Sequence, residues 1–595
     1  MSTAERGWGD AHVKAYRERV FRERDLLTRA AGEAAQWQQR VLEDLLEFNA
    51  GTEFGRAHGF GRIRTVDDFR RAVPVHGYDD LEPWIERMAA GERHVLTADA
   101  PVVYFTSSGS TGAHKKVPVT PRFMATTFFP FFYAAWAPMV EHHPDVVGPD
   151  AVLNLKQDPL PVPGTTKDGR PHLGASQVDF GAAFGEPLSA EPGTRARWAA
   201  LPVDVAADAH LEKAYLRLRL AVEHPDLRGV IGINPAAVAA LPHQLTTWWD
   251  RIVREIRDGT VGGARVVDPN PARAAELDAL TRRFDPVRPA HVWPRLRVVF
   301  CWTGGVAALY LPRLREEYGI GVEVLPAPIA ASEGPTAVTL DRHPRAGSLV
   351  VTASLYEFVP ADEPVGPDVA TLRAHELEPG REYQVIYSHV GGLYRYAGGD
   401  VVRVVDALGG VARVEYAGRA TVSDAAGERL RESHVLGAVT AALDESGLEV
   451  RNLSCRVVGG TPGYEFAVAP TTPWSDAETA RIARRLDAHL ADRSAGYRAA
   501  RAEGRLTDPT LRLLDADAFH RDWHARVEEG TRPAQVKDRL FRTSDADWHR
   551  LVGDRATTAF PPAEGHRPVG DRSAATSGSG DRATASTSAH PGDRP

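Results

Sequence analysis

The chain has 595 residues, too many for a single hydrophobic core, so we expect two or more domains. Its 43% hydrophobic and 25% charged residues are ordinary for a globular protein, and a formal charge of -8 argues against nucleic acid or an acidic membrane surface as a partner. Two cysteines exclude a disulfide framework and a cysteine-based zinc site, and no apolar segment of signal-peptide type lies near residue 1, so we expect a cytoplasmic protein.

The N-terminal part of the chain has helical patterns. Apolar residues recur every three or four positions, which predicts a helix over 11–50 that ends at Gly51. The segment 65–91 predicts two short helices separated at Pro74.

From residue 98 onward, apolar strand-like runs alternate with amphipathic helices. The runs that predict strands are 101–108, 150–155, 227–233, 296–305 and 322–334. Helices are predicted between them, for example over 209–224 and 242–259. This alternation predicts an α/β architecture.

The pattern changes again after residue 346. Short strands over 347–416 predict a β-rich subdomain. A further unit begins after Arg419, with a helix near 431–445, strands near 451–469 and a long helix near 476–503. Residues 553–595 are poor in apolar residues and predict a disordered tail.

The first predicted strand runs into a segment rich in hydroxyl, glycine and lysine residues. These are Ser107, Ser108, Gly109, Ser110, Thr111, Gly112, Lys115 and Lys116. Such a loop can direct several backbone N–H groups and an ammonium at one anion, although a polar surface loop is the alternative. The Walker spacing does not fit, because residue 114 is His and no Ser or Thr follows the lysines. We therefore expect a phosphate site of another kind.

The motif "SSGSTGAHK" is similar to the phosphate loop of the adenylate-forming superfamily. Seven further motifs resemble, in order, those of the Gretchen Hagen family of auxin-responsive acyl-acid amido synthetases: 69–92, 298–314, "IAASEG" (329–334), "LYEFVP" (355–360), "GLYRYAGGDVVRV" (392–404), "GERLRE" (427–432) and "QVKDRLF" (535–541). Each motif is short, but the resemblance runs in the family's order over about residues 35–545.

The resemblance implies a fold and a division into domains. It implies a large α/β N-terminal adenylate-forming domain over 1–418, which includes the β-rich subdomain, and a small mobile α+β domain over 419–552. The tail, 553–595, stands outside both.

The resemblance also implies a ligase reaction with ATP and Mg²⁺. A carboxylic acid attacks the α-phosphate of ATP and releases pyrophosphate, and an amine, typically of an amino acid, then displaces AMP from the acyl-adenylate. The partners expected for such a monomeric enzyme are a small carboxylic acid and an amine or amino acid, with no nucleic acid and no membrane. A thiol acceptor such as coenzyme A, or a degenerate nucleotide- or acyl-acid-binding protein without turnover, are the alternatives.

The motif matches assign residues to roles. Lys537 and Glu333 would be catalytic, with Glu333 also holding Mg²⁺. The ATP site would comprise Ser107, Ser108, Gly109, Ser110, Thr111, Gly112, one of Lys115 and Lys116, Ala331, Ser332, Asp400 and Arg419. The substrate site would comprise Gly304, Gly305, Tyr310 and Ile329.

Each assignment has a structural alternative. Glu333 and Asp400 are equally typical of turns, Arg419 of a surface and Lys537 of a solvated position, while Tyr394 and Arg395 could be structural. The aromatic segment 128–140 fits either a buried helix or the wall of an acyl pocket.

The sequence also departs from the family pattern. Ile329 replaces an aromatic residue, Arg429 replaces a lysine, and the 535–541 motif lacks its usual Tyr and Pro.

Overall fold

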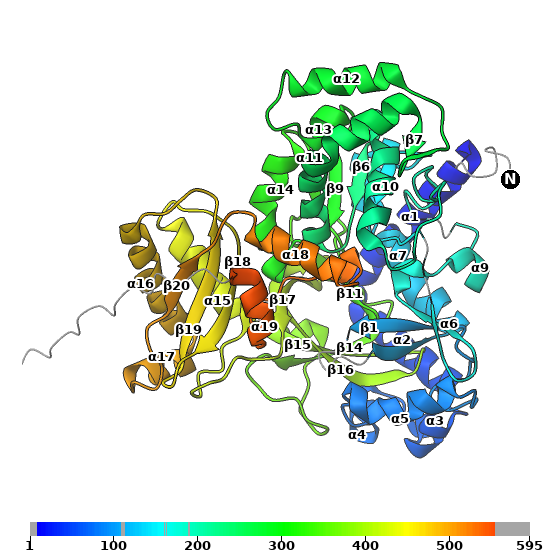
Figure 1. The fold of residues 1–595 in the computed structure, drawn as a ribbon. Helices are drawn as coiled ribbons and strands as arrows, with labels where there is room; N and C mark the ends of the chain where they lie inside the picture. The colour runs from blue at the N-terminus through cyan, green and yellow to red at the C-terminus, as the bar shows by residue number, and fades with distance from the viewer. Residues whose placement is uncertain (1–8, 109–113, 160, 162, 189–190, 554–595) are drawn as a thin grey trace, which may run out of the picture. The chain divides into compact units, whose positions relative to one another are not determined.

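The structure of the protein, a computed structural model, describes residues 9–108, 114–159, 161, 163–188 and 191–553 (Figure 1). Residues 109–113 of the predicted phosphate loop and the predicted tail beyond residue 553 lie outside this part of the chain.

The predicted N-terminal helix is two helices, α1 (Asp10–Ala31) and α2 (Ala34–Asn49). The chain leaves the first helix at Gly32, whose backbone N–H bonds back to the carbonyl of Arg29. This break lets Tyr16 of α1 and Leu42 of α2 enter the same core, which one straight helix could not do. The two helices around Pro74 are confirmed as α4 (Val66–Ala72) and α5 (Tyr78–Ala89).

A four-stranded parallel sheet forms the centre of the α/β unit. Its order is β10 (Glu323–Pro326), β9 (Val298–Cys301), β6 (Gly229–Ile231) and β3 (Val152–Asn154). Helices α10 (His210–Val222), α11 (Pro235–Asp258) and α14 (Leu311–Tyr318) share its hydrophobic core, and Figure 1 shows them beside these strands. Burial on both faces explains the continuous apolar runs of β6 and β9.

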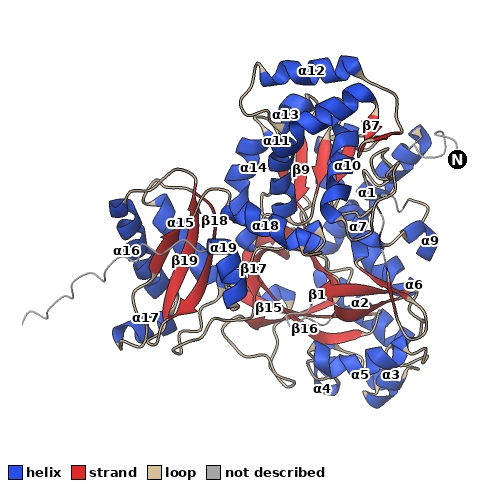
Figure 2. Ribbon diagram, in the orientation of Figure 1, coloured by secondary structure: helices blue, strands red, loops and turns tan. Residues whose placement is uncertain are grey.

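Two further sheets lie in the part of the chain before residue 420 (Figure 2). In the first, β1 (Val103–Ser108) pairs antiparallel with β2 (His114–Val119) and parallel with β5 (Pro171–Leu173), which pairs with β4 (Gly164–Thr165). The second is antiparallel and confirms the predicted β-rich subdomain. Its order is β11 (Ile329–Ala331), β12 (Gly334–Val338), β13 (Ala346–Leu349), β17 (Val411–Arg419), β16 (Leu393–Leu408), β15 (Glu382–His389) and β14 (Leu355–Pro360).

The C-terminal unit has its own sheet and core. The sheet contains β18 (Val450–Val458), β19 (Gly463–Pro470) and β20 (Thr510–Leu513), and the helices are α15 (Glu432–Asp444), α16 (Asp476–Arg493) and α17 (Ala495–Ala502). The predicted long helix over 476–503 is therefore interrupted. Ser494 has an extended backbone, and its hydroxyl accepts from the N–H of Tyr497 to cap α17.

The segment 518–540, which we call the C-terminal strap, leaves this unit. It contains α18 (Ala518–Glu528) and the short helix η8 (Pro533–Gln535). Trp523, Val527 and Val536 join the core of the parallel-sheet unit, against α10 and α11. The chain then returns to β18, where the N–H of Cys455 bonds to the carbonyl of Leu540.

Shorter elements connect these units. They are α3 (Glu53–Ala57), α6 (Pro121–Phe123), α7 (Phe129–Ala134), α8 (Ala137–His142), α9 (Phe180–Phe184), α12 (Pro271–Thr281), α13 (Pro289–Val292), α19 (Asp545–Val552), β7 (Thr260–Val261) and β8 (Ala264–Arg265). The helical stretch Pro121–His142 is long and apolar enough to cross a membrane by composition, but 78% of its apolar 18-residue window is buried inside the protein, as in a core helix.

Candidate active site

A cavity of about 630 Å³ lies between α7, α10, the ends of β3 and β9, and the C-terminal strap. Phe128, Phe131, Phe132 and Trp136 line it, whereas Phe129 and Tyr133 of the same stretch are buried in the core. This division follows the helical period, which places residues three and four apart on one face. The aromatic segment is thus both a core helix and a wall of the cavity, the two alternatives that its sequence left open.

Lys537 enters this cavity from the strap. Its ammonium lies 4.7 Å from the centroid of the Trp302 ring. Burial lowers the pKa of Lys537, and the nearby charges of Asp400, Arg419 and Glu333 act on it as well. The side chain keeps exposed surface because it lines the cavity. The fold therefore brings the charges of three predicted site residues to bear on a fourth, Lys537, although Glu333 and Lys537 are 204 positions apart in the sequence.

Asp400 and Arg419 face each other across the last rungs of β16 and β17. The Arg419 guanidinium donates to the Asp400 carboxylate at 2.7 Å and to the carbonyl of Gly398 at 2.7 Å. Gly399 has a φ of 81°, the left-handed conformation that favours glycine, and it lies where the register of β16 against β15 shifts just before Asp400. The carboxylate is held in place and keeps 23% of its side chain exposed.

Glu333 follows β11 and is buried. Its carbonyl bonds to His389 at 2.8 Å, and Tyr396 contacts its carboxylate at 3.4 Å. Ala331 and Ser332 line the cavity, and the Ser332 hydroxyl donates to the carbonyl of Thr106 in β1 at 3.0 Å. That bond ties the Glu333 turn to the strand that leads into the phosphate loop.

The structure describes only some of the predicted phosphate-loop residues. Ser107 and Ser108 end β1, where the backbone of Ser107 lies opposite Lys115 of β2. Gly109, Ser110, Thr111 and Gly112 lie outside the described residues.

The two lysines differ in their partners. Lys116 forms an ion pair with Glu86 of α5, whereas the Lys115 ammonium lies 4.8 Å from the centroid of the Tyr78 ring. An aromatic face leaves the charge of Lys115 available, while Glu86 neutralises that of Lys116.

The residues assigned to the substrate lie elsewhere. Gly304 and Gly305 allow the close approach of Tyr416, because a Cβ at Gly304 would lie 3.2 Å from the Tyr416 carbonyl oxygen. Ile329 begins β11 and packs partly buried against the large core. Neither they nor Tyr310 are among the described residues that line the cavity. Their substrate roles stay predictions.

Tyr310 instead contacts the strap. Its hydroxyl donates to the carboxylate of Asp538, and the Asn452 amide donates to the same carboxylate at 2.5 Å and to the Tyr310 hydroxyl at 3.1 Å. Burial raises the pKa of Asp538. Asp538 thus joins the α/β unit to the C-terminal unit at the residue next to Lys537, a role that the sequence motif did not reveal.

The neighbouring strap residues are anchored through their backbone carbonyls. Asn234 donates to the carbonyl of Val536, Arg526 to that of Lys537 at 3.0 Å, and Ser454 to that of Arg539 at 2.7 Å. Asn234 caps α11, whereas Ser454 belongs to β18. The lysine is therefore held from both units at once.

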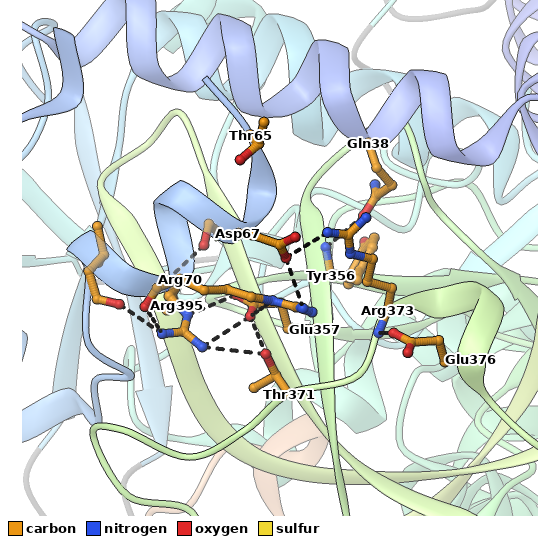
Figure 3. A network of polar contacts seen from close by, with 12 residues as sticks. Gln38, Thr65, Asp67, Arg70, Tyr356, Glu357, Thr371, Arg373, Glu376 and Arg395 are labelled. Atoms are coloured by element: carbon orange, nitrogen blue, oxygen red, sulfur yellow. Dashed lines mark hydrogen bonds and ion pairs between the residues drawn. The ribbon is translucent and has the colours of Figure 1, made fainter. Parts of the chain in front are cut away.

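Arg395 has a structural role, which its motif left open (Figure 3). Its guanidinium donates to both oxygens of the buried Glu357 carboxylate, at 2.9 and 3.0 Å, and Arg70 and Thr371 donate to the same carboxylate. Its φ of 45° is uncommon for a residue other than glycine. Two of the sequence motifs, 355–360 and 392–404, thus pair with each other in the interior. Arg429, the replacement for lysine, also has a φ of 45° and is exposed.

Comparison with known proteins gives a consistent result. Residues 24–323 match the GH3 family N-terminal domain, 347–419 the central domain and 433–544 the C-terminal domain. A probable indole-3-acetic acid-amido synthetase of Oryza sativa subsp. japonica is 28% identical over 66% of this chain and 69% of its own. The jasmonoyl–L-amino acid synthetase JAR6 of Nicotiana attenuata is 25% identical over 85% of this chain and 90% of its own.

Among solved structures, the GH3.15 acyl acid amido synthetase shares the fold. It covers 89% of this chain with a TM-score of 0.72 at 19% identity, and 95% of its own length is matched. Because the three domain matches occupy most of the sequence in order, the chain belongs to the GH3 family.

Proposed function

We propose that this protein is an ATP-dependent acyl-acid amido synthetase, which activates a carboxylic acid as its adenylate and transfers the acyl group to an amino acid. The observation that carries the proposal is that the charges of Glu333, Asp400 and Arg419 act on Lys537, which lines an aromatic-walled cavity. The names of the amido synthetases that share the three domains support it.

In the first step an oxygen of the acid attacks the α-phosphorus of ATP. The bond from that phosphorus to the bridging oxygen breaks, and pyrophosphate leaves. Negative charge grows on the α-phosphate and the bridging oxygen, and the Lys537 ammonium stabilises it. Asp400, fixed by Arg419, is placed to accept the ribose hydroxyls.

The donor set fits a magnesium ion that arrives with ATP. Mg²⁺ is commonly held by one or two carboxylates together with substrate phosphates and water, and Glu333 supplies one such carboxylate here. In the described part of the chain no cluster of three His, Cys, Asp or Glu could hold a metal by itself. When bound, Mg²⁺ would offset the phosphate charge that repels the attacking carboxylate.

In the second step the amine nitrogen attacks the acyl carbon and AMP leaves, with one proton lost from the nitrogen. The strap that carries Lys537 belongs to the C-terminal unit, so we expect that unit to move aside for the amine. Lys537 then serves the first step alone.

The cavity indicates what kind of acid is activated. A volume of about 630 Å³ is within the range of sites for drug-sized ligands and far exceeds the needs of acetate. Rings at Phe128, Phe132 and Trp136 favour an acid with an aromatic or cyclic body.

The test is a pyrophosphate-release screen with ATP, Mg²⁺ and aliphatic and aromatic acids, repeated with pools of amino acids, simple amines and coenzyme A. We expect pyrophosphate and AMP with an aromatic or cyclic acid, and an amide when an amino acid is added. ADP and phosphate as products would mean attack at the γ-phosphate and would overturn the proposal. A thioester with coenzyme A but no amide would reassign the acceptor.

A further inference from the structure

The cavity contains a second group of charged residues, distinct from those around Lys537. Among the described residues that line it, six are lysines or arginines and three are carboxylates. The cations are Lys156, Arg195, Lys213, Arg217, Arg532 and Lys537, and the carboxylates are Asp158, Asp179 and Glu191. This excess of positive charge occurs in a protein whose formal charge is -8.

Four basic residues surround one of these carboxylates, Asp158; we call His210, Lys213, Arg217 and Arg532 the basic cluster. Lys213 forms an ion pair with Asp158 at 2.6 Å, and His210 lies 3.8 Å from it. His210, Lys213 and Arg217 follow the helical spacing of α10, which places them on one face. Arg532 reaches the same place from the strap, where the charge of Asp158 acts on it.

The positive charge of the basic cluster exceeds what Asp158 can neutralise. Arg217 donates to the carbonyls of Gln157 at 2.7 Å and of Trp198 at 3.3 Å, and Arg532 donates to Gln535 at 3.2 Å. In the part of the chain that the structure describes, neither arginine forms an ion pair with a carboxylate. A buried cation without a counterion is costly, and an anion would relieve that cost.

The protonation behaviour agrees with this geometry. Burial lowers the pKa of Arg217 to about 10, and burial also lowers the pKa values of Arg532 and His210. Several lowered pKa values around one cavity are typical of a functional site.

The basic cluster is separate from the reacting centre. The charges that act on Lys537 are those of Asp400, Arg419 and Glu333, whereas Asp158 is the charged residue that acts on Arg217 and Arg532. The basic cluster, in which Lys213 pairs with Asp158, therefore consists of other residues than the Asp400–Arg419 pair whose charges act on Lys537.

We propose that the basic cluster binds a second substrate carboxylate, in addition to the one that is activated. Its source is the α-carboxylate of the amino-acid acceptor or a distal carboxylate on the acid itself. The assignment of this carboxylate to one of the two substrates rests on the proposed function. The presence of a carboxylate site in the cavity does not rest on it. Because Arg532 belongs to the strap, this carboxylate would also contact the segment that delivers Lys537.

Two pairs of probes distinguish the sources, each differing in one carboxylate. L-Phenylalanine is compared with L-phenylalaninamide as acceptor, and terephthalate with 4-methylbenzoate as acid. We expect the member of one pair that carries the additional carboxylate to be preferred in turnover by about 10- to 100-fold, as for hydrogen bonds to a charged group. Arg532→Gln should remove most of that preference, and Arg532→Lys should retain part of it.

The matched control is Arg521→Gln. Arg521 is an exposed arginine on α18 of the same strap, paired with Asp515 at 3.1 Å, so this variant loses the same charge outside the cavity. It should keep the wild-type preference. Loss of preference for L-phenylalanine would identify the acceptor as the source, and loss for terephthalate would identify the acid.

Calorimetric titration of all four probes without ATP separates this inference from the proposed function. If no acid supports pyrophosphate release, the proposed function fails. Tighter binding of the probe with the additional carboxylate by the wild type, and equal binding of both probes by Arg532→Gln, would still support the carboxylate site. Equal affinity within both pairs for the wild type, or a preference that Arg532→Gln leaves intact, would overturn it.

Discussion

Tyr310→Phe is the sharpest perturbation of the link between the two units. It removes one hydroxyl, which donates to Asp538 and accepts from Asn452. The residue is 4% exposed, and phenylalanine keeps its ring and its packing. What is lost is a hydrogen bond to a buried carboxylate next to Lys537.

The expected size follows from that bond. A hydrogen bond to a charged group contributes about 1.5–3 kcal/mol, which corresponds to about 10- to 150-fold in an equilibrium constant. If the bond holds the strap in place for adenylation, kcat for pyrophosphate release should fall by about 10- to 100-fold. KM for ATP should change little, because Tyr310 lies outside the nucleotide residues.

The assay separates the two half-reactions. Pyrophosphate release from acid and ATP reports adenylation, and amide formation from supplied acyl-adenylate reports the second step. Tyr310→Phe should slow the first far more than the second. In a double variant with Lys537→Ala, Tyr310→Phe should slow adenylation little further, since both changes remove the contribution of a correctly placed Lys537.

The control is Tyr318→Phe, another buried tyrosine, whose hydroxyl donates to the carbonyl of Val238 at 2.8 Å within the α/β unit. It loses a buried hydrogen bond without touching the strap and should slow neither step selectively. Equal loss of both half-reactions in Tyr310→Phe, or full additivity with Lys537→Ala, would show that the tyrosine supports the fold rather than the position of the lysine.

Three other predictions concern single side chains. Lys537→Ala should lower kcat for pyrophosphate release by about 10²–10³-fold. Burial lowers the pKa of Lys537 from its ordinary 10.5, and the cation is the active form. The wild-type rate should therefore fall as the pH rises through this lowered pKa, below pH 10.5. Lys537→Arg should move this alkaline limb to higher pH, and an unmoved limb would assign the titration to another group. Lys115→Ala should raise KM for ATP by about tenfold and Lys116→Ala by less, because an acidic partner already neutralises Lys116; the reverse order in initial-rate kinetics would contradict this. Glu357→Gln should lower the free energy of unfolding by about 3–5 kcal/mol in urea, since it leaves buried arginines without their counterion, whereas Glu378→Gln at an exposed ion pair should change it by less than about 1 kcal/mol.

The sequence by itself determined features that depend on neighbouring residues. The alternation of apolar runs and helical periods predicted the α/β unit and the β-rich sheet, and both are present, because local patterns decide which face of an element can be buried. The order of short motifs indicated the family that the domain matches support. Helix breaks at Gly32 and Ser494 were missed, since the apolar pattern continues across both and the packing of the following helix decides where the chain turns.

Only the tertiary structure decided which residues meet. Lys115 and Lys116 are adjacent in sequence, yet strand geometry sends one to Tyr78 and the other to Glu86. Tyr310, which its motif assigns to the substrate, contacts Asp538, and Asp158 and Arg532 line the same cavity although they are 374 positions apart. Such contacts follow from how sheets, helices and the returning strap pack together, and no local period in the sequence encodes them.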